Sequence, residues 1–275
     1  MPEPATLTIV IVSYNVRDDL DACLRSIVGA TGPHRTHVVV VDNSSQDGTP
    51  AMLRDRWPDV QLIEAGGNLG FSRANNLGIR ATSSEFVLLL NPDTVVSKTA
   101  IPALVSTLRS RPDAAIAAPR IVDADNVPEL SFGYAISPLG ELRQKIIGTL
   151  HHRGIGAGRA LVERWSRIAG AREWVSGACL LSRRADLDAV GLLDERYFMY
   201  TEDVDLCVEM RKRGRQVLFV PDAQIVHLRG RSVTRNPDAE RLRRRSHLAY
   251  YEKHHRAWAP LLRAYLRVTG KMPRP

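Results

Sequence analysis

Short runs of apolar residues alternate with segments of helical spacing along the first half of the chain. Four such runs, at residues 7–12, 37–41, 60–64 and 86–90, are rich in Val, Ile and Leu and are too short for helices. The segments that follow them predict a helix after each strand, because apolar residues recur there three and four positions apart. Strands that alternate with helices on short connections predict a doubly wound, mainly parallel sheet.

Further helices and strands are predicted along the chain, and the pattern is less regular in its second half. The further predicted elements are helices over residues 50–57, 68–78, 98–109 and 202–213 and strands over residues 114–118, 174–182, 216–220 and 223–226. Ser97 is expected to cap the helix that begins at residue 98. Residues 138–170 lack clear periodicity, and their glycine run at 154–158 fails the dinucleotide pattern GxGxxG at Arg159, so we expect a flexible loop or lid there.

One apolar run ends abruptly at an acidic turn, Asn91-Pro92-Asp93. The uninterrupted run at residues 86–90 suits a strand that is covered on both faces. Pro92 cannot donate to a neighbouring strand and favours an extended conformation at Asn91, so the strand should end there. Asp93 would then lie beyond the carboxyl edge of the sheet, where open α/β folds bind ligands. A plain turn is the alternative, since all three residue types favour turns.

Composition limits the architecture and the compartment. The 275 residues are 44% apolar, which suits one large α/β domain with a C-terminal extension. No run of about 18 apolar residues is present, and residues 1–6 lack the pattern of a secretory signal, so neither a membrane span nor export is expected. Cys23, Cys179 and Cys207 lie far apart without CxxC spacing, and we expect reduced core thiols in a cytoplasmic protein.

Positive charge is concentrated at the C-terminal end. From Arg229 onward the chain carries 13 Lys and Arg against 3 Asp and Glu, so this tail has a net charge of +10 and the first 228 residues have −2. Apolar residues recur at helical spacing within the tail, at Trp258, Leu261, Leu262, Tyr265 and Val268. A basic amphipathic helix is typical of a segment that lies on an anionic membrane surface. Packing against the rest of the protein is the alternative.

Seven motifs, taken in order, resemble those of the inverting family 2 glycosyltransferases of the GT-A fold, and most closely the bacterial rhamnosyltransferase-like members. They cover roughly residues 8–232, and their order and spacing make the resemblance specific. The motifs are Ile11-Val12-Ser13-Tyr14-Asn15, Val41-Asp42-Asn43-Ser44-Ser45-Gln46-Asp47-Gly48, Asn68-Leu69-Gly70-Phe71-Ser72-Arg73-Ala74-Asn75-Asn76-Leu77-Gly78, Asn91-Pro92-Asp93, Ser176-Gly177-Ala178, Thr201-Glu202-Asp203-Val204-Asp205 and His227-Leu228-Arg229-Gly230-Arg231-Ser232.

The resemblance implies a divalent cation at the diphosphate of a sugar-nucleotide donor, where it would stabilise the departing oxygens. Asp93 matches the last acid of the family's DxD motif, but Asn91 replaces the first, so the diphosphate must supply much of the coordination. His227 matches a histidine that often completes this site in relatives, with a purely structural histidine as the alternative. Oxygen ligands suit Mg²⁺ or Mn²⁺, and a nitrogen ligand slightly favours Mn²⁺.

The resemblance also implies a donor pocket at the ends of the first strands. Asp42 matches the acid that accepts a hydrogen bond from a pyrimidine N3–H, and turn capping is the alternative. The other residues that would line the pocket are Ser13, Tyr14, Asn15, Asn68, Arg73 and Asn75. Arg73 is expected either at a donor phosphate or on the solvent-facing side of its helix.

Two neighbouring acids are the candidates for catalysis. Asp203 matches the family's general base, which takes the proton of the acceptor hydroxyl on the face opposite the leaving group, and Glu202 is its partner in the Glu-Asp pair. In the alternative, Thr201 caps the helix and the acids only stabilise its positive N-terminus.

These features predict a metal-dependent inverting glycosyltransferase that moves rhamnose from dTDP-rhamnose to a lipid-linked or cell-envelope glycan acceptor, at the inner face of the cell membrane. A UDP- or GDP-sugar transferase on the same fold is the alternative; a catalytically silent or basic nucleic-acid- or membrane-binding protein is the alternative of another class. No nucleic-acid-binding signature is present, so no such partner is expected. We expect a donor half (about residues 1–120), an acceptor half (about 121–232) and a basic helical extension (233–275).

Overall fold

A mixed sheet forms the centre of the molecule. The computed structural model describes residues 6–134, 136–137, 140–141, 143, 147, 149, 156–228 and 238–273. Among these residues the sheet contains the strands β1 (Leu7–Ser13), β2 (Thr36–Asp42), β3 (Gln61–Glu64), β4 (Phe86–Leu90), β5 (Thr94–Val96), β6 (Ala114–Val122), β8 (Gly170–Ala171), β10 (Cys179–Arg183) and β11 (Gln216–His227). Their order is β3-β2-β1-β4-β10-β6-β11-β5, and β8 pairs with β11.

The strand directions confirm the predicted mixed, mainly parallel sheet. β3, β2, β1 and β4 run parallel, and so do β6 and β11. β10 runs antiparallel to both β4 and β6, and the short strands β5 and β8 run antiparallel to β11. A second small sheet pairs β7 (Phe132–Gly133) with β9 (Trp174–Val175).

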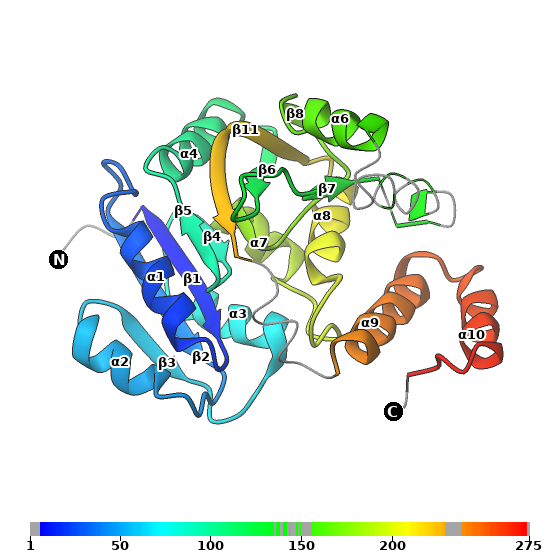
Figure 1. The fold of residues 1–275 in the computed structure, drawn as a ribbon, viewed down its shortest axis with the longest axis horizontal. Helices are drawn as coiled ribbons and strands as arrows, with labels where there is room; N and C mark the ends of the chain where they lie inside the picture. Colours follow the sequence, from blue (N-terminus) through cyan, green and yellow to red (C-terminus); the bar gives the residue numbers. More distant parts are fainter. Residues whose placement is uncertain are drawn as a thin grey trace.

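Helices cover both faces of the central sheet (Figure 1). They are α1 (Arg17–Ile27), α2 (Thr49–Arg56), α3 (Gly70–Arg80), α4 (Ala100–Ser110), α6 (Gly156–Trp165), α7 (Arg184–Val190), α8 (Glu202–Lys212), α9 (Ala239–His254) and α10 (Ala259–Val268). One core cluster joins the sheet to α1, α2 and α4, and the others join its opposite face to α3, α7 and α8.

β4 shows why its sequence is apolar without interruption. Phe86, Leu88 and Leu90 belong to the core cluster on the α1 and α4 side, whereas Val87 and Leu89 belong to the cluster on the α8 side. Successive side chains of a strand point to opposite faces, so a strand that is covered on both faces must be apolar at every position. All five residues are at most 1% exposed.

Several predicted boundaries were wrong. α4 begins at Ala100 and not at residue 98, and it has no side-chain cap, because residues 94–96 form the unpredicted strand β5 and a turn follows it. The predicted strand at 174–182 is divided into β9 and β10 by the turn at Gly177. The two strands predicted around Pro221 form one strand, β11, with an irregular register between Val220 and Gln224.

The segment predicted as a loop or lid contains secondary structure. Residues 156–165 form α6 and residues 170–171 form β8, so the prediction of a loop was wrong there. Most of residues 138–155, and the predicted domain boundary at residue 232, lie outside the described residues. Within the described part of the chain, no helix is both long enough and apolar enough to cross a membrane. Cys23, Cys179 and Cys207 are free and buried, as expected of core thiols.

Candidate functional site

Polar residues gather where the parallel strands end. β3, β2, β1 and β4 are neighbours and run in one direction, so their carboxyl ends meet at one edge of the sheet. Ser13 and Asp42, the last residues of β1 and β2, stand opposite each other in the ladder. The backbone N–H of Asn43 donates to the carbonyl of Ser13 over 2.8 Å, which holds the two strand ends together.

The end of β2 carries an acceptor that the protein leaves free. Asp42 is 2% exposed, and its Oδ2 accepts a hydrogen bond from the backbone N–H of Ser45 over 2.9 Å. Its Oδ1 has no hydrogen-bond partner among the described residues, and neither has the hydroxyl of the fully buried Ser13. Buried polar atoms are nearly always paired, so these two atoms point to a ligand that binds at the ends of β1 and β2.

The other predicted donor-binding residues differ in their surroundings. Tyr14 is 48% exposed, and the side chain of Asn15 accepts a hydrogen bond from the backbone N–H of Gln46 over 2.7 Å. Asn68 is exposed and Asn75 is buried, and each makes a local hydrogen bond at α3. These contacts shape the loops around the pocket.

Arg73 lies on the outer side of α3. It is exposed, and its Nε stands 3.5 Å from Glu195 Oε2. This placement matches the solvent-facing alternative, and contact with a donor phosphate stays a prediction.

Asp93 and His227 meet although they are 134 positions apart. The short ladder between β5 and β11 places Thr94 opposite His227, and the backbone N–H of Leu228 donates to the carbonyl of Asp93 over 2.8 Å. His227 Nε2 lies 3.2 Å from Asp93 Oδ1, and both side chains are buried. One carboxylate and one imidazole at this spacing fit a divalent cation whose other ligands come from a bound diphosphate.

Asn91, the residue in place of the motif's first acid, is partly exposed. Its backbone N–H donates to the carbonyl of Ala178 over 2.9 Å. This bond brings the end of β4 beside the start of β10.

Glu129 is a third charged group at this place, and the sequence motifs did not reveal it. Its Oε2 lies 3.5 Å from His227 Nδ1, on the other side of the ring from Asp93. Burial opposes protonation of His227, but the hydrogen bonds and charges of Asp93 and Glu129 outweigh it and raise the pKa of His227 to about 9. Without a cation, the imidazolium therefore bridges two carboxylates.

Asp203 lies at the N-terminal end of α8, beside the Ser176-Gly177-Ala178 turn. Its Oδ2 accepts a hydrogen bond from the backbone N–H of Gly177 over 2.8 Å. A Cβ atom at residue 177 would lie 3.1 Å from the Asp203 Cβ, so any larger residue there would push the two segments apart by a few tenths of an ångström. Burial raises the pKa of Asp203, opposed by the N–H groups of Gly177 and Val204, and part of the side chain stays exposed. A partly exposed carboxylate of raised pKa is suited to accept a proton.

Glu202 is placed differently from its neighbour. It is 6% exposed, and its Oε2 has no hydrogen-bond partner within the described chain. Burial, and then the charge of Asp203, raise the pKa of Glu202 well above its ordinary value. Because Glu202 is enclosed while Asp203 reaches the surface, the geometry favours Asp203 as the base.

The turn before these acids is strained. Tyr200 and Thr201 have φ angles of 70° and 74°, in the left-handed region, where each non-glycine residue costs about 1–3 kcal/mol. Thr201 makes no side-chain capping hydrogen bond to α8, although it directly precedes the helix. Stabilising contacts must therefore come from neighbouring elements.

The donor side supplies one of these contacts. The backbone N–H of Phe71 donates to the carbonyl of Phe198 over 2.6 Å. Gly70 has a φ of +79°, and a Cβ there would lie 2.4 Å from the Phe198 oxygen, so glycine is required on both counts. Asn43, beside the donor pocket, donates from its side chain to the carbonyl of Gly70 over 3.1 Å.

Comparisons with known proteins agree with this geometry. A family model described as glycosyltransferase like family 2 matches residues 4–259. The chain is 34% identical over 266 residues, 90% of its own length and 81% of the other, to an N-acetylglucosaminyl-diphospho-decaprenol L-rhamnosyltransferase of Mycobacterium tuberculosis.

Two solved structures share the fold. The first is a Pyrobaculum calidifontis mannosyltransferase in complex with GDP-Man and Mn²⁺, with a TM-score of 0.63 and 19% identity over 96% of this chain and 70% of that one. The second is GalNAc-T7 with UDP, GalNAc and Mn²⁺, with a TM-score of 0.59 and 15% identity over 83% of this chain and 44% of that one.

The raised pKa of His227 predicts a specific dependence of stability on pH. Because the pKa rises from 6.5 in the unfolded chain to about 9 in the metal-free fold, protonated His227 stabilises the fold below pH 6.5, and this contribution is lost as the pH rises through 9. The contribution is at most about 3 kcal/mol, since one pKa unit corresponds to about 1.4 kcal/mol. Urea unfolding in EDTA at pH 6 and pH 10 should show a smaller difference between wild type and His227→Gln at pH 10. A difference that is equal at both values contradicts the prediction.

Proposed function

Because the chain belongs to glycosyltransferase-like family 2, we propose that it transfers rhamnose from dTDP-rhamnose to a hydroxyl of a lipid-linked glycan, with inversion at the anomeric carbon. The resemblance seen in the motifs is confirmed, and the chain is a glycosyltransferase of the GT-A fold. One observation carries the proposal: three polar sites stand on segments that meet at one edge of the sheet. They are the buried oxygen of Asp42 without a partner among the described residues, the carboxylate–imidazole pair of Asp93 and His227, and the carboxylate of Asp203, whose pKa is raised.

The donor base would lie at the ends of β1 and β2. Asp42 Oδ1 is buried and lacks a partner among the described residues, so it can accept the N3–H of thymine. Uracil presents the same N3–H, and guanine presents N–H donors of its own, which leaves UDP- and GDP-sugars as the alternative. The likeness to the Mycobacterium tuberculosis L-rhamnosyltransferase favours a rhamnosyl donor and a diphosphate-linked polyprenol acceptor.

Asp93 and His227 would hold a divalent cation at the donor diphosphate. The two solved structures of the same fold are complexes with Mn²⁺, and the imidazole favours Mn²⁺ over Mg²⁺. When bound, such a cation neutralises charge on the leaving diphosphate. His227 must give up its Nε2 proton to become a ligand, and Glu129 stands at the opposite nitrogen, where it can keep the ring oriented.

Asp203 would act as the general base. The acceptor oxygen attacks the anomeric carbon while the bond from that carbon to the diphosphate oxygen breaks, and the diphosphate leaves with the electron pair. The acceptor's proton passes to Asp203 Oδ1 or Oδ2, on the face opposite the leaving group. The N–H of Gly177 holds the carboxylate in place, and the raised pKa of Glu202, caused by burial and by the charge of Asp203, disfavours a second charge beside it.

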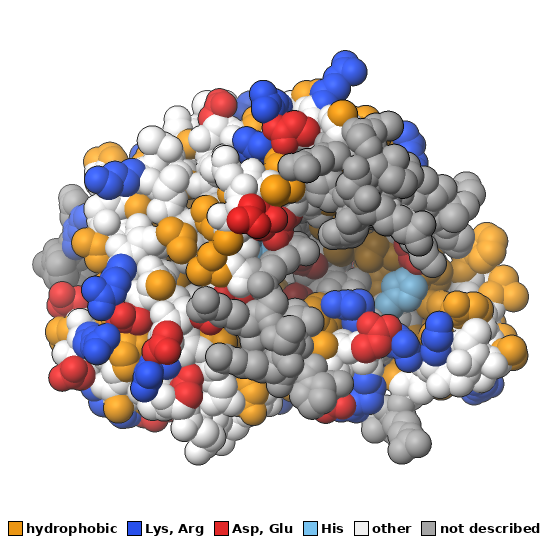
Figure 2. Space-filling view, viewed as in Figure 1, with side chains coloured by type: hydrophobic (Ala, Val, Ile, Leu, Met, Phe, Trp, Pro, Cys, Tyr) orange, Lys and Arg blue, Asp and Glu red, His pale blue; other side chains and the backbone are white. Residues whose placement is uncertain are grey.

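The C-terminal helix α10 would contact the membrane that holds a lipid-linked acceptor. Its inner side packs on α9 through Ala259 and Leu262. Its outer side exposes Leu261 (62%), Tyr265 (57%) and Val268 (88%). Apolar side chains gather with Lys and Arg at this end of the molecule (Figure 2), and α10 contains no Asp or Glu. Exposed apolar side chains on a helix that carries Arg and no acid suit an anionic lipid surface.

Asp203→Asn should separate a transferase from a silent sugar-nucleotide-binding protein. The amide keeps the size of the side chain but cannot take a proton, so turnover should fall by roughly 10²- to 10⁴-fold with melting temperature and dTDP affinity retained. Glu202→Gln is the matched variant and should lose much less, because Glu202 is enclosed and Gln keeps its size. Near wild-type turnover in Asp203→Asn would reject the base assignment.

Asp93→Asn should weaken Mn²⁺ binding by at least about 10-fold. Of the two proposed protein ligands, Asp93 and His227, only Asp93 carries a negative charge, and the variant removes it. Calorimetric titration of Mn²⁺ in the presence of dTDP measures the affinity. Asp222→Asn, which changes an exposed acid of the same strand β11, serves as the control. Equal affinities in wild type and both variants would contradict a cation at Asp93.

Leu261→Ser combined with Tyr265→Ser should reduce sedimentation with vesicles of phosphatidylglycerol by about 10-fold or more, because both changes remove apolar area from the lipid-facing side of α10. Val28→Ser changes a side chain that is 68% exposed beside α1 and should have no effect. Sedimentation that is unchanged in the double variant, or equal with neutral vesicles, would assign α10 to packing alone.

A further inference from the structure

The carboxylate of Asp205, two residues after Asp203 on α8, is held by three donors. Tyr197 OH donates to its Oδ1 over 3.1 Å, and His254 Nε2 lies 2.6 Å from the same oxygen. Lys253 Nζ donates to its Oδ2 over 2.8 Å. The Asp205 and His254 side chains are 2% and 4% exposed. Since Lys253 and His254 are adjacent on α9, this cluster fixes α8 to α9.

The same cluster resembles a cation site in its residue types. Ligand atoms of Asp205, Glu209 and His254 lie close enough to share a metal ion. The ammonium of Lys253, however, stands 2.8 Å from Asp205 and 3.6 Å from Glu209. The positive charge that two carboxylates require is therefore already supplied by α9.

A second part of α9 holds the strained turn before Glu202. Ser246 Oγ donates to the carbonyl of Met199 over 2.7 Å. The guanidinium of Arg243 lies over the ring of Tyr200, 4.9 Å from its centre. Left-handed residues persist only where their surroundings determine them, and α9 supplies these two contacts beside the one from the donor side.

We propose that α9 is a positioning element of the active site: Lys253, His254 and Ser246 hold α8 and its preceding turn so that Asp203 stays at the N–H of Gly177. The proposal rests on the proposed function, in which Asp203 is the base. α9 lies between α10 and the α8 side of the sheet (Figure 1), so the basic extension is expected to serve catalysis as well as membrane contact.

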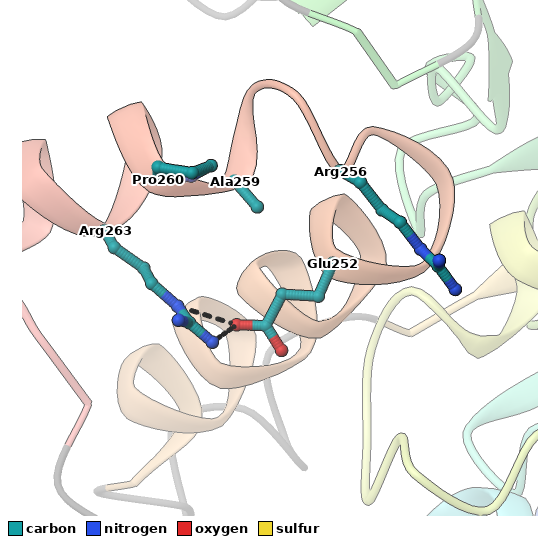
Figure 3. Close-up of a pocket in the computed structure, with 5 residues that line it drawn as sticks. All are labelled: Glu252, Arg256, Ala259, Pro260 and Arg263. Carbon is teal, nitrogen blue, oxygen red and sulfur yellow. Dashed lines mark hydrogen bonds and ion pairs between the residues drawn. The ribbon is translucent and has the colours of Figure 1, made fainter.

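The test compares Lys253→Met and Ser246→Ala with Glu252→Gln. Lys253→Met removes the ion pair of α9 with Asp205, together with those to Asp194 and Glu209, and Ser246→Ala removes the hydrogen bond to Met199. Glu252 also lies on α9, but its ion pair with Arg263 faces α10, across a surface hollow lined by Arg256, Ala259 and Pro260 (Figure 3). Turnover of a detergent-solubilised acceptor, dTDP affinity and the amide resonance of Gly177 are measured on each protein below its melting temperature.

Lys253→Met and Ser246→Ala should lower turnover by about 10-fold or more, keep dTDP affinity within about twofold and shift the Gly177 resonance. Glu252→Gln should change none of the three, and Lys253→Arg should recover part of the lost turnover. An unshifted Gly177 resonance in both loss variants, or equal losses in Glu252→Gln, overturns the proposal. A wild type without transferase activity would refute the proposed function, while the Gly177 resonance would still decide whether α9 positions Asp203.

Discussion

The pairing of two short backbone stretches decides where the charges of this protein meet. β5 has only three residues, but its ladder with the end of β11 places Asp93 against His227. The pairing also makes β5 the edge strand next to β11, and β5 follows directly on the Asn91-Pro92-Asp93 turn that the buried strand β4 delivers. A different register of β11 would move His227 to the opposite face and leave a buried carboxylate without its partner.

The sequence predicted the elements that depend on the local spacing of apolar and polar residues. It did not predict contacts between residues far apart in the chain. The first four strands, the end of β4 and the start of α8 follow from apolar runs and polar ends. β5 is too short for any period to reveal, and the helix α6 begins in a glycine run that favours a loop. Glu129 lies 98 residues before its partner His227, and Lys253 lies 48 residues after its partner Asp205. No motif or period in the sequence indicates contacts between such distant positions.

The adjacent acids at the start of α8 show how one fold gives similar side chains different states. Burial raises the pKa of both, but Asp203 reaches the surface and receives the N–H groups of Gly177 and Val204, which oppose the rise, whereas Glu202 is enclosed with an oxygen that has no partner among the described residues. The charged form is therefore less disfavoured on Asp203 than on Glu202. Exposure and hydrogen bonding together distinguish the two neighbours.

The close contact of Gly70 with Phe198 limits how this enzyme can change. Gly70 belongs to the donor side and Phe198 to the turn that leads to the proposed base, and the space between them admits no methyl group. Gly70 thus sets the distance between the residues proposed to bind the donor and the turn before the proposed base. Random substitution should therefore be tolerated less at position 70 than at many residues of the proposed donor site. Altered acceptor specificity should arise more readily in variants that keep the contact between Gly70 and Phe198.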